Sequence, residues 1–299
     1  MTTIKSIRRA LWPARRPLVS PLRLRIEMQA QIQNRGSSKI RDGKMIWYLF
    51  TDMANQFVGS IDVFPPARVL EKAERNMVAM IKVPTLHPGE SFSPTVVLRI
   101  DTTTRDWLIE PVDTPEPIKR SIVGTYTRMH KYWETEDPLI QKFSEKVAER
   151  SSNDETYARA AMAVVRESVK LKTHLDERRG AARAVREREG DCDEHADLFI
   201  ALTRAVRIPS RRVVGHYFRG GPEPEPHAWC EVFLEQRGWV PVDPALNRFG
   251  VLTENYFSRI RQGLESERPT IQFKYNGTSS TPVTIEEEVR MSILTNGDK

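Results

Sequence analysis

The chain has 299 residues, of which 39% are hydrophobic and 29% charged, and its formal net charge is +6. This length predicts about two domains of ~150 residues each, and the composition excludes a fibrous or fully disordered protein. No run approaches the roughly 18 apolar residues that a membrane-spanning helix needs. Two cysteines cannot form a disulfide framework, which favours a cytoplasmic setting.

Residues 1–21 are predicted to form a basic, flexible arm. Seven cations precede the first acid, Glu27, and prolines and arginines interrupt "RRALWPARRPLVSPLRLR". That interruption argues against a secretory signal, which needs an unbroken apolar run after its charges. Contact with a nucleic acid or an anionic surface is an alternative for this arm, but the arginines lack the interleaved aromatic residues of nucleic-acid-binding segments.

Residues 22–112 are predicted to form a β-sandwich-like domain. Segments such as "LRLRIEMQAQIQ", "KMIWYLFTD" and "PTVVLRIDT" alternate apolar and polar residues, and turn signals such as "NRGSS" and "LHPGE" separate them. A proline-bearing stretch follows, and residues 113–136 are predicted to be a linker.

Residues 137–265 are predicted to be an α+β domain. Helical periodicity begins at Asp137–Pro138 and returns in three further segments, the last of which starts near Cys192. "RRVVGHYFRG" and "HAWCEVFLEQRGWVPVDP" then read as antiparallel strands. We expect residues 266–299 to be strands that complete or flank this second domain.

Cys192 is predicted to lie in the first turn of a helix, with Asp191 as its N-cap. Unpaired N–H groups and the helix dipole favour a thiolate there, whereas the neighbouring Asp193 and Glu194 oppose it. An imidazolium would shift the balance toward the thiolate, and His227 is the leading candidate for it.

His227 begins one predicted strand and Asp243 ends the next, and a short turn joins the two strands. Antiparallel pairing could therefore bring the two side chains together. With Cys192 they would supply a nucleophile, a base and a carboxylate that orients the base.

Two other interpretations of these residues stay open. Cys192 could be an inert core thiol, which is the usual role of a lone buried cysteine. Alternatively, Cys192, His195, His227 and Cys230 could bind zinc, although on a regular strand Cys230 faces away from His227.

Three ordered blocks, "GDCDEHADLFIALTRAVRIPSRRVVG", "HAWCEVFL" and "GWVPVDPA", closely resemble the transglutaminase-like superfamily of bacteria and archaea. The resemblance covers roughly residues 138–257, and the upstream half looks like the sandwich that precedes this domain in many bacterial relatives. It implies a papain-like arrangement with Cys192 as nucleophile, His227 as general base and Asp243 as its orienter.

One feature departs from the family pattern. Many relatives carry a tryptophan and then another aromatic residue before the cysteine, and the tryptophan is linked to stabilising the oxyanion. Here Val164 and Leu171 align with those positions. The backbone N–H of Cys192 can serve as one oxyanion donor, and the second is unassigned.

The predicted function is a thiol enzyme that acts on amide or peptide bonds through a thioester. Water as acceptor would make it a protease or amidase, and an amine acceptor would make it an amide-forming acyltransferase. We expect a peptide, protein or amide-bearing substrate, no cofactor and no metal, since no "DxDxDG" calcium loop is present. A catalytically silent module that binds a peptide or protein is the alternative.

Overall fold

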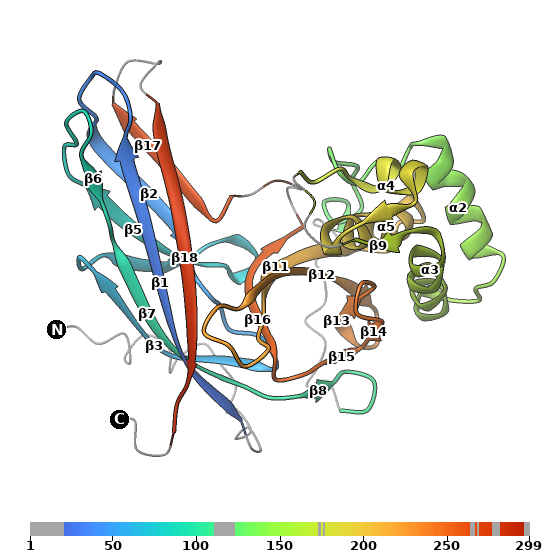
Figure 1. Ribbon diagram of the computed structural model, residues 1–299. Helices are drawn as coiled ribbons and strands as arrows, with labels where there is room; N and C mark the ends of the chain where they lie inside the picture. Colours follow the sequence, from blue (N-terminus) through green and yellow to red (C-terminus); the bar gives the residue numbers. More distant parts are fainter. Residues whose placement is uncertain are drawn as a thin grey trace.

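The computed structural model describes residues 21–110, 123–172, 175, 177–263, 267, 269–276 and 282–295. Almost all of the basic arm, and residues 113–122 of the predicted linker, lie outside the described residues. Figure 1 shows two halves: long strands form one, and helices beside a shorter sheet form the other. This α+β architecture with a strand-rich region before the second domain confirms the predicted fold class.

The strand-rich half contains two sheets whose inner faces share one hydrophobic core. One sheet has the order β18-β1-β7-β3, with β6 also paired to β1, and the other has the order β17-β2-β5-β4. Alternation sets the inner face of β1, because Leu24, Ile26 and Met28 are buried while the residues between them are more exposed. The strands are β1 (Leu22–Asn34), β2 (Arg41–Tyr48), β3 (Gln56–Phe64), β4 (Arg68–Glu71), β5 (Met77–Val83), β6 (Ser91–Phe92), β7 (Thr95–Thr102), β17 (Ile271–Asn276) and β18 (Val283–Ile293).

The last two strands pair with the first two, which differs from the expectation that residues 266–299 complete or flank the second domain. β18 runs antiparallel to β1 from Leu24↔Ile293 to Asn34↔Val283, and β17 pairs with β2. Figure 1 shows β18 beside β1, at the edge of its sheet. Apolar–polar alternation identifies a strand but carries no information about a partner far away in the sequence.

Among the described residues, the second half places four helices beside an antiparallel sheet with the order β14-β13-β12-β11-β16. α5 is its central helix and contacts the other three helices as well as β11 and β12. The helices are α2 (Pro138–Ala148), α3 (Asp154–Ser168), α4 (Ala181–Glu187) and α5 (Cys192–Ala205). The sheet strands are β11 (Ser210–Tyr217), β12 (Glu225–Leu234), β13 (Gly238–Asp243), β14 (Arg248–Phe249) and β16 (Tyr256–Gln262).

In the part of the chain that the structure describes, four short strands pair outside these sheets, and one single-turn helix lies in the strand-rich half. β9 (Lys170–Leu171) lies parallel to β10 (Glu189–Gly190), directly before α5. β8 (Arg105–Asp106) pairs with β15 (Val251–Leu252), and a 3-10 turn spans Ala73–Arg75. Within the described residues, no helix is both long enough and apolar enough to cross a membrane.

β16 connects the two halves through buried contacts. Its Phe257 belongs to the sandwich core, and the side-chain amide of Gln56 bonds both backbone groups of Ser258 at 2.8 Å. The next residue, Arg259, is buried and forms a bidentate ion pair with Glu287 on β18. The strand that follows the predicted site in sequence is therefore held by the sandwich.

Candidate active site

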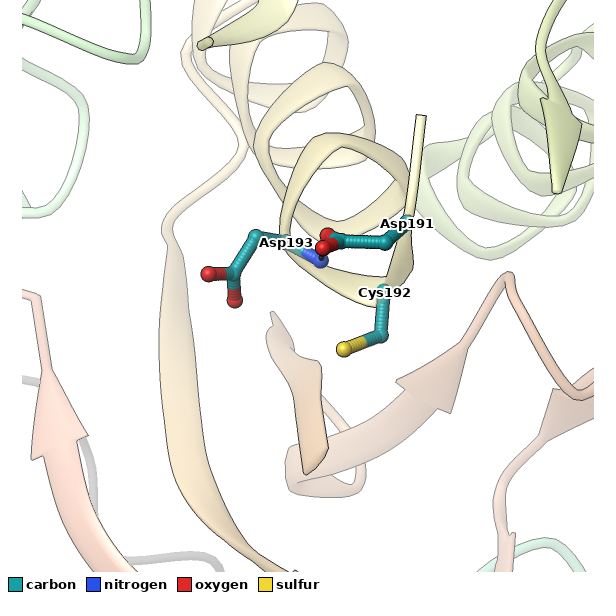
Figure 2. A group of neighbouring side chains, drawn as sticks. All are labelled: Asp191, Cys192 and Asp193. Carbon is teal, nitrogen blue, oxygen red and sulfur yellow. Dashed lines mark hydrogen bonds between the residues drawn. The ribbon is translucent and has the colours of Figure 1, made fainter. Parts of the chain in front are cut away.

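Cys192 lies at the first position of α5, where local contacts fix the start of the helix. The Asp191 carboxylate accepts the backbone N–H of Asp193 at 2.8 Å, and Glu194 accepts the N–H of Asp191 at 3.0 Å, which completes a capping box. Figure 2 shows the side chains of Asp191, Cys192 and Asp193 next to one another at the start of this helix. Gly190 is required before them, because a Cβ there would lie 2.4 Å from the Cβ of Glu194.

The structure brings His227 and Asp243 together as the predicted pairing of β12 and β13 requires. His227 Nε2 lies 2.7 Å from Asp243 Oδ2. Asp243 is fully buried, and its Oδ1 accepts the backbone N–H of Leu246 at 2.9 Å. The hydroxyl of Tyr256 donates to the same Oδ2 at 2.7 Å, so three donors hold this carboxylate.

Cys192 interacts with the same imidazole and helps to raise the pKa of His227. Burial alone would lower the pKa of His227, but hydrogen bonds and charge interactions with Asp243 and Cys192 outweigh it and raise the pKa to about 10. The imidazolium is the favoured form of this ring, and it lies beside the half-buried thiol.

The two acids that oppose a thiolate at Cys192 are both offset in the structure. Burial would raise the pKa of Asp193, but the charges of Arg212 and Arg178 outweigh it and lower that pKa, so the carboxylate is matched by cations. Burial raises the pKa of Glu194 to about 7, which reduces its negative charge near neutral pH. Neither acid therefore leaves a full uncompensated charge beside Cys192.

Aromatic rings surround the His227 imidazole. Trp229 stacks against it at 6.0 Å between centroids, and Tyr217 meets it edge-on at 6.1 Å. Tyr256 lies 5.9 Å away and also packs against Trp229 at 5.3 Å. These rings pack around the imidazole, and only 9% of the His227 side chain is exposed.

Sequence reasoning missed Tyr256, because the sequence analysis predicts no strand over residues 256–262 and a lone tyrosine ordinarily signals only core packing. Its link to Asp243 depends on the order of strands in the sheet, which no short motif encodes.

The four residues of the zinc alternative do not form one ligand group among the described residues. His195 Nδ1 lies 2.7 Å from the carbonyl of Asp191, and its Nε2 lies 3.1 Å from the carbonyl of Val169. Cys230 is fully buried and donates to the carbonyl of Ala196 at 3.4 Å, and burial raises its thiol pKa well above the ordinary value. Within the described part of the chain, one group holds three ligand atoms within 4.8 Å, and it consists of Asp191, Cys192 and Asp193.

The two carboxylates of that group, those of Asp191 and Asp193, already bind other partners within the protein. Asp191 caps α5 and Asp193 pairs with Arg212. The chemistry of these contacts suits a helix start more than a cation site.

Val164 and Leu171 supply no oxyanion donor where relatives carry aromatic residues. Val164 is a buried core residue of α3, and Leu171 on β9 is 43% exposed and pairs with Gly190. The first-turn N–H groups of α5 have no acceptor within the helix, so the N–H of Cys192 is placed to donate.

Comparison with known proteins agrees with this architecture. Residues 141–244 match the model of the transglutaminase-like superfamily, so the chain contains a transglutaminase-like domain, as its motifs predict. A structure described as a "putative cysteine protease" from Cytophaga hutchinsonii shares the fold at a TM-score of 0.65 and 18% identity, with 93% of this chain and 92% of that one covered.

The periplasmic domain of TgpA from Pseudomonas aeruginosa is a more distant match. Its TM-score is 0.41 at 11% identity, with 76% of this chain and 88% of that one covered. No curated protein sequence matches the chain.

Proposed function

We propose that the protein is a thiol enzyme that cleaves or transfers amide bonds, with Cys192 as nucleophile, His227 as general acid–base and Asp243 as the residue that orients the imidazole. One observation carries the proposal: the buried Asp243 carboxylate bonds Nε2 of the His227 ring at 2.7 Å, and Cys192 interacts with the same imidazole and helps to raise its pKa. A nucleophile, a base and an orienting carboxylate in this order are the parts of a cysteine-enzyme triad.

The first half-reaction forms a thioester. The Cys192 thiolate adds to the carbonyl carbon, and the N–H of Cys192 stabilises the resulting oxyanion. His227 then delivers its proton to the amine nitrogen as the C–N bond breaks, so the amine leaves neutral.

The second half-reaction consumes the thioester. His227, now neutral, takes a proton from water or from an amine as that nucleophile attacks, and the C–S bond breaks to restore the thiolate. Water yields a carboxylic acid and an amine yields a new amide. Asp243 stays ionised throughout and stabilises the imidazolium whenever it forms.

The proposed substrate is a peptide, a protein or another amide-bearing molecule. The fold shared with the Cytophaga hutchinsonii structure and the family of residues 141–244 support this class. Both cysteines are free, and we propose a cytoplasmic setting, where thiols stay reduced.

An activated ester tests the proposal without knowledge of the natural substrate. p-Nitrophenyl acetate should acylate Cys192 with a burst of one equivalent of p-nitrophenolate, and mass spectrometry should find the acetyl group on Cys192. Cys192→Ala should abolish the burst, whereas Cys230→Ala, which removes the buried second thiol, should retain it. An acetyl group on any other residue, or a burst that survives Cys192→Ala, would contradict the proposal.

The same assay separates hydrolysis from transfer. If primary amines such as glycine amide accelerate turnover and the acetylated amine accumulates, the enzyme is an acyltransferase. If turnover is independent of added amine, water is the acceptor.

A further inference from the structure

We infer that Tyr256 is a positioning residue of the triad: its hydroxyl bonds the Asp243 carboxylate and thereby sets the strength with which Asp243 holds the His227 imidazolium. The inference rests on the proposed function of Cys192, His227 and Asp243. It assigns a role to a residue outside the part of the chain that matches the superfamily model, which ends at residue 244.

The geometry places the two donors on one atom. Asp243 Oδ2 accepts Tyr256 Oη at 2.7 Å and His227 Nε2 at 2.7 Å. Both Asp243 and Tyr256 are fully buried, so water does not compete for this oxygen. In such surroundings a hydrogen bond to a charged group has a larger effect than it has in water.

The tyrosine hydroxyl competes with the imidazolium for the same negative charge. Its donation disperses charge from Oδ2, which keeps the carboxylate ionised and weakens the pull of that oxygen on the proton of His227. The Asp243 contact raises the pKa of His227, and a weaker pull limits this rise. The imidazole can then release its proton to the leaving amine, which general acid catalysis requires.

The sandwich fixes the position of Tyr256. Tyr256 points its hydroxyl at the triad, while the next residue along β16, Phe257, packs into the sandwich core. The Gln56 side chain forms hydrogen bonds with the backbone of Ser258, and Glu287 of β18 forms an ion pair with Arg259. Residues of the sandwich therefore hold β16 in place, and with it the Tyr256 hydroxyl that bonds the partner of His227.

The experiment compares pH profiles of Cys192 alkylation by iodoacetamide, which need no natural substrate. Tyr256→Phe removes the hydroxyl and retains the ring. Tyr157→Phe is the matched control, because it removes another buried tyrosine hydroxyl that bonds Ser144 at 2.8 Å on the helical side of the domain. Thermal unfolding of both variants measures the structural cost of a lost buried hydroxyl.

We expect Tyr256→Phe to move the alkaline limb of the profile, where His227 loses its proton, upward by ~0.5 to 1 pH unit. Tyr157→Phe should leave this limb in place at a similar loss of thermal stability. If Tyr256→Phe does not fold, site-specific 3-fluorotyrosine at position 256 serves instead. It is a stronger donor of nearly the same shape, and it should move the limb downward.

The outcomes separate the inference from the function on which it rests. If wild-type Cys192 shows a pH profile that depends on His227, but Tyr256→Phe and the fluorotyrosine protein both superimpose on it, the role of Tyr256 is wrong and the triad stands. If Tyr157→Phe moves the limb equally, the effect is structural and the role is also wrong. If wild-type Cys192 shows no profile that depends on His227, the proposed function itself is wrong.

Discussion

The carboxylate of Asp193, the residue that directly follows Cys192, forms an ion pair with Arg212 on the adjacent strand β11. The guanidinium also donates to the side chain of Gln262 at 2.7 Å and is nearly buried, so its position is fixed. This pair places a cation beside the residue that follows the nucleophile. The cation offsets the negative charge of Asp193, which would otherwise disfavour a thiolate at Cys192.

Replacement of Arg212 by Met should slow alkylation of Cys192. Without this guanidinium, only Arg178 of the two arginines still offsets the charge of Asp193, and the less compensated carboxylate disfavours the thiolate. The iodoacetamide rate at pH 6 should fall by ~3- to 10-fold. Arg183→Met, which removes an exposed cation from α4, is the control and should retain the wild-type rate.

Gly215→Ala should destabilise the protein strongly. A Cβ at Gly215, which pairs with His227 across β11 and β12, would lie 2.1 Å from the carbonyl oxygen of Phe257. Overpacking lowers the free energy of unfolding by about 1–3 kcal/mol, and a clash with a backbone atom should lie at the upper end of this range, which urea denaturation measures. Gly221→Ala is the matched control, because its Cβ meets no atom within 4 Å. Equal stability of the two variants would contradict the close approach of β11 and β16.

The pair of Glu287 and Arg259 should make stability fall in acid. Burial would raise the pKa of Glu287, but Arg259 outweighs it and lowers that pKa. A depressed pKa in the folded state gives stability that is present above the unfolded pKa of about 4.3 and is lost as the pH falls through the folded value.

Glu287→Gln should therefore be less stable than the wild type at pH 7 and should lose less of its stability between pH 5 and 3. Glu288→Gln, at the neighbouring exposed glutamate that pairs with Arg290, is the control and should follow the wild-type pH dependence. Identical acid sensitivity of Glu287→Gln and the wild type would contradict a stabilising ion pair between Glu287 and Arg259.

His227 should make stability fall at alkaline pH. Its pKa is raised to about 10, so the folded protein holds a proton that the unfolded chain releases near pH 6.5. The resulting stabilisation is complete below pH ~6.5 and is lost progressively as the pH rises toward 10. Urea denaturation at pH 6, 8 and 10 should show this decline in the wild type and a smaller one in His227→Gln. Parallel declines would contradict an imidazolium in the folded site.

The sequence motifs predict much of the domain that carries the site. The cap at Asp191, the strands that hold His227 and Asp243, and the transglutaminase-like resemblance all depend on local patterns of a few residues, which is why they can be read from one sequence. The structure places these side chains in contact, and their catalytic roles remain predictions that the experiments above test.

Long-range features are not encoded in such patterns. The pairing of β18 with β1 joins Leu24 to Ile293 across almost the whole chain, and alternation in either segment fits many partners. The bond from Tyr256 to Asp243 depends on β16 lying beside β11 at the sheet edge. Likewise, the cation that offsets Asp193 comes from β11, so the sequence shows the opposing acid but not its compensation.

Iodoacetamide labelling of the native protein across pH, with adducts on Cys192 and Cys230 counted separately by mass spectrometry, measures the nucleophile most directly. Cys192 should react well below the pH at which an ordinary thiol with a pKa of ~8.5 reacts, and His227→Ala should change its profile. Cys230, which is fully buried, should lag until the protein unfolds. If both thiols stay inert until unfolding, Cys192 is not an activated nucleophile and the enzymatic proposal is wrong.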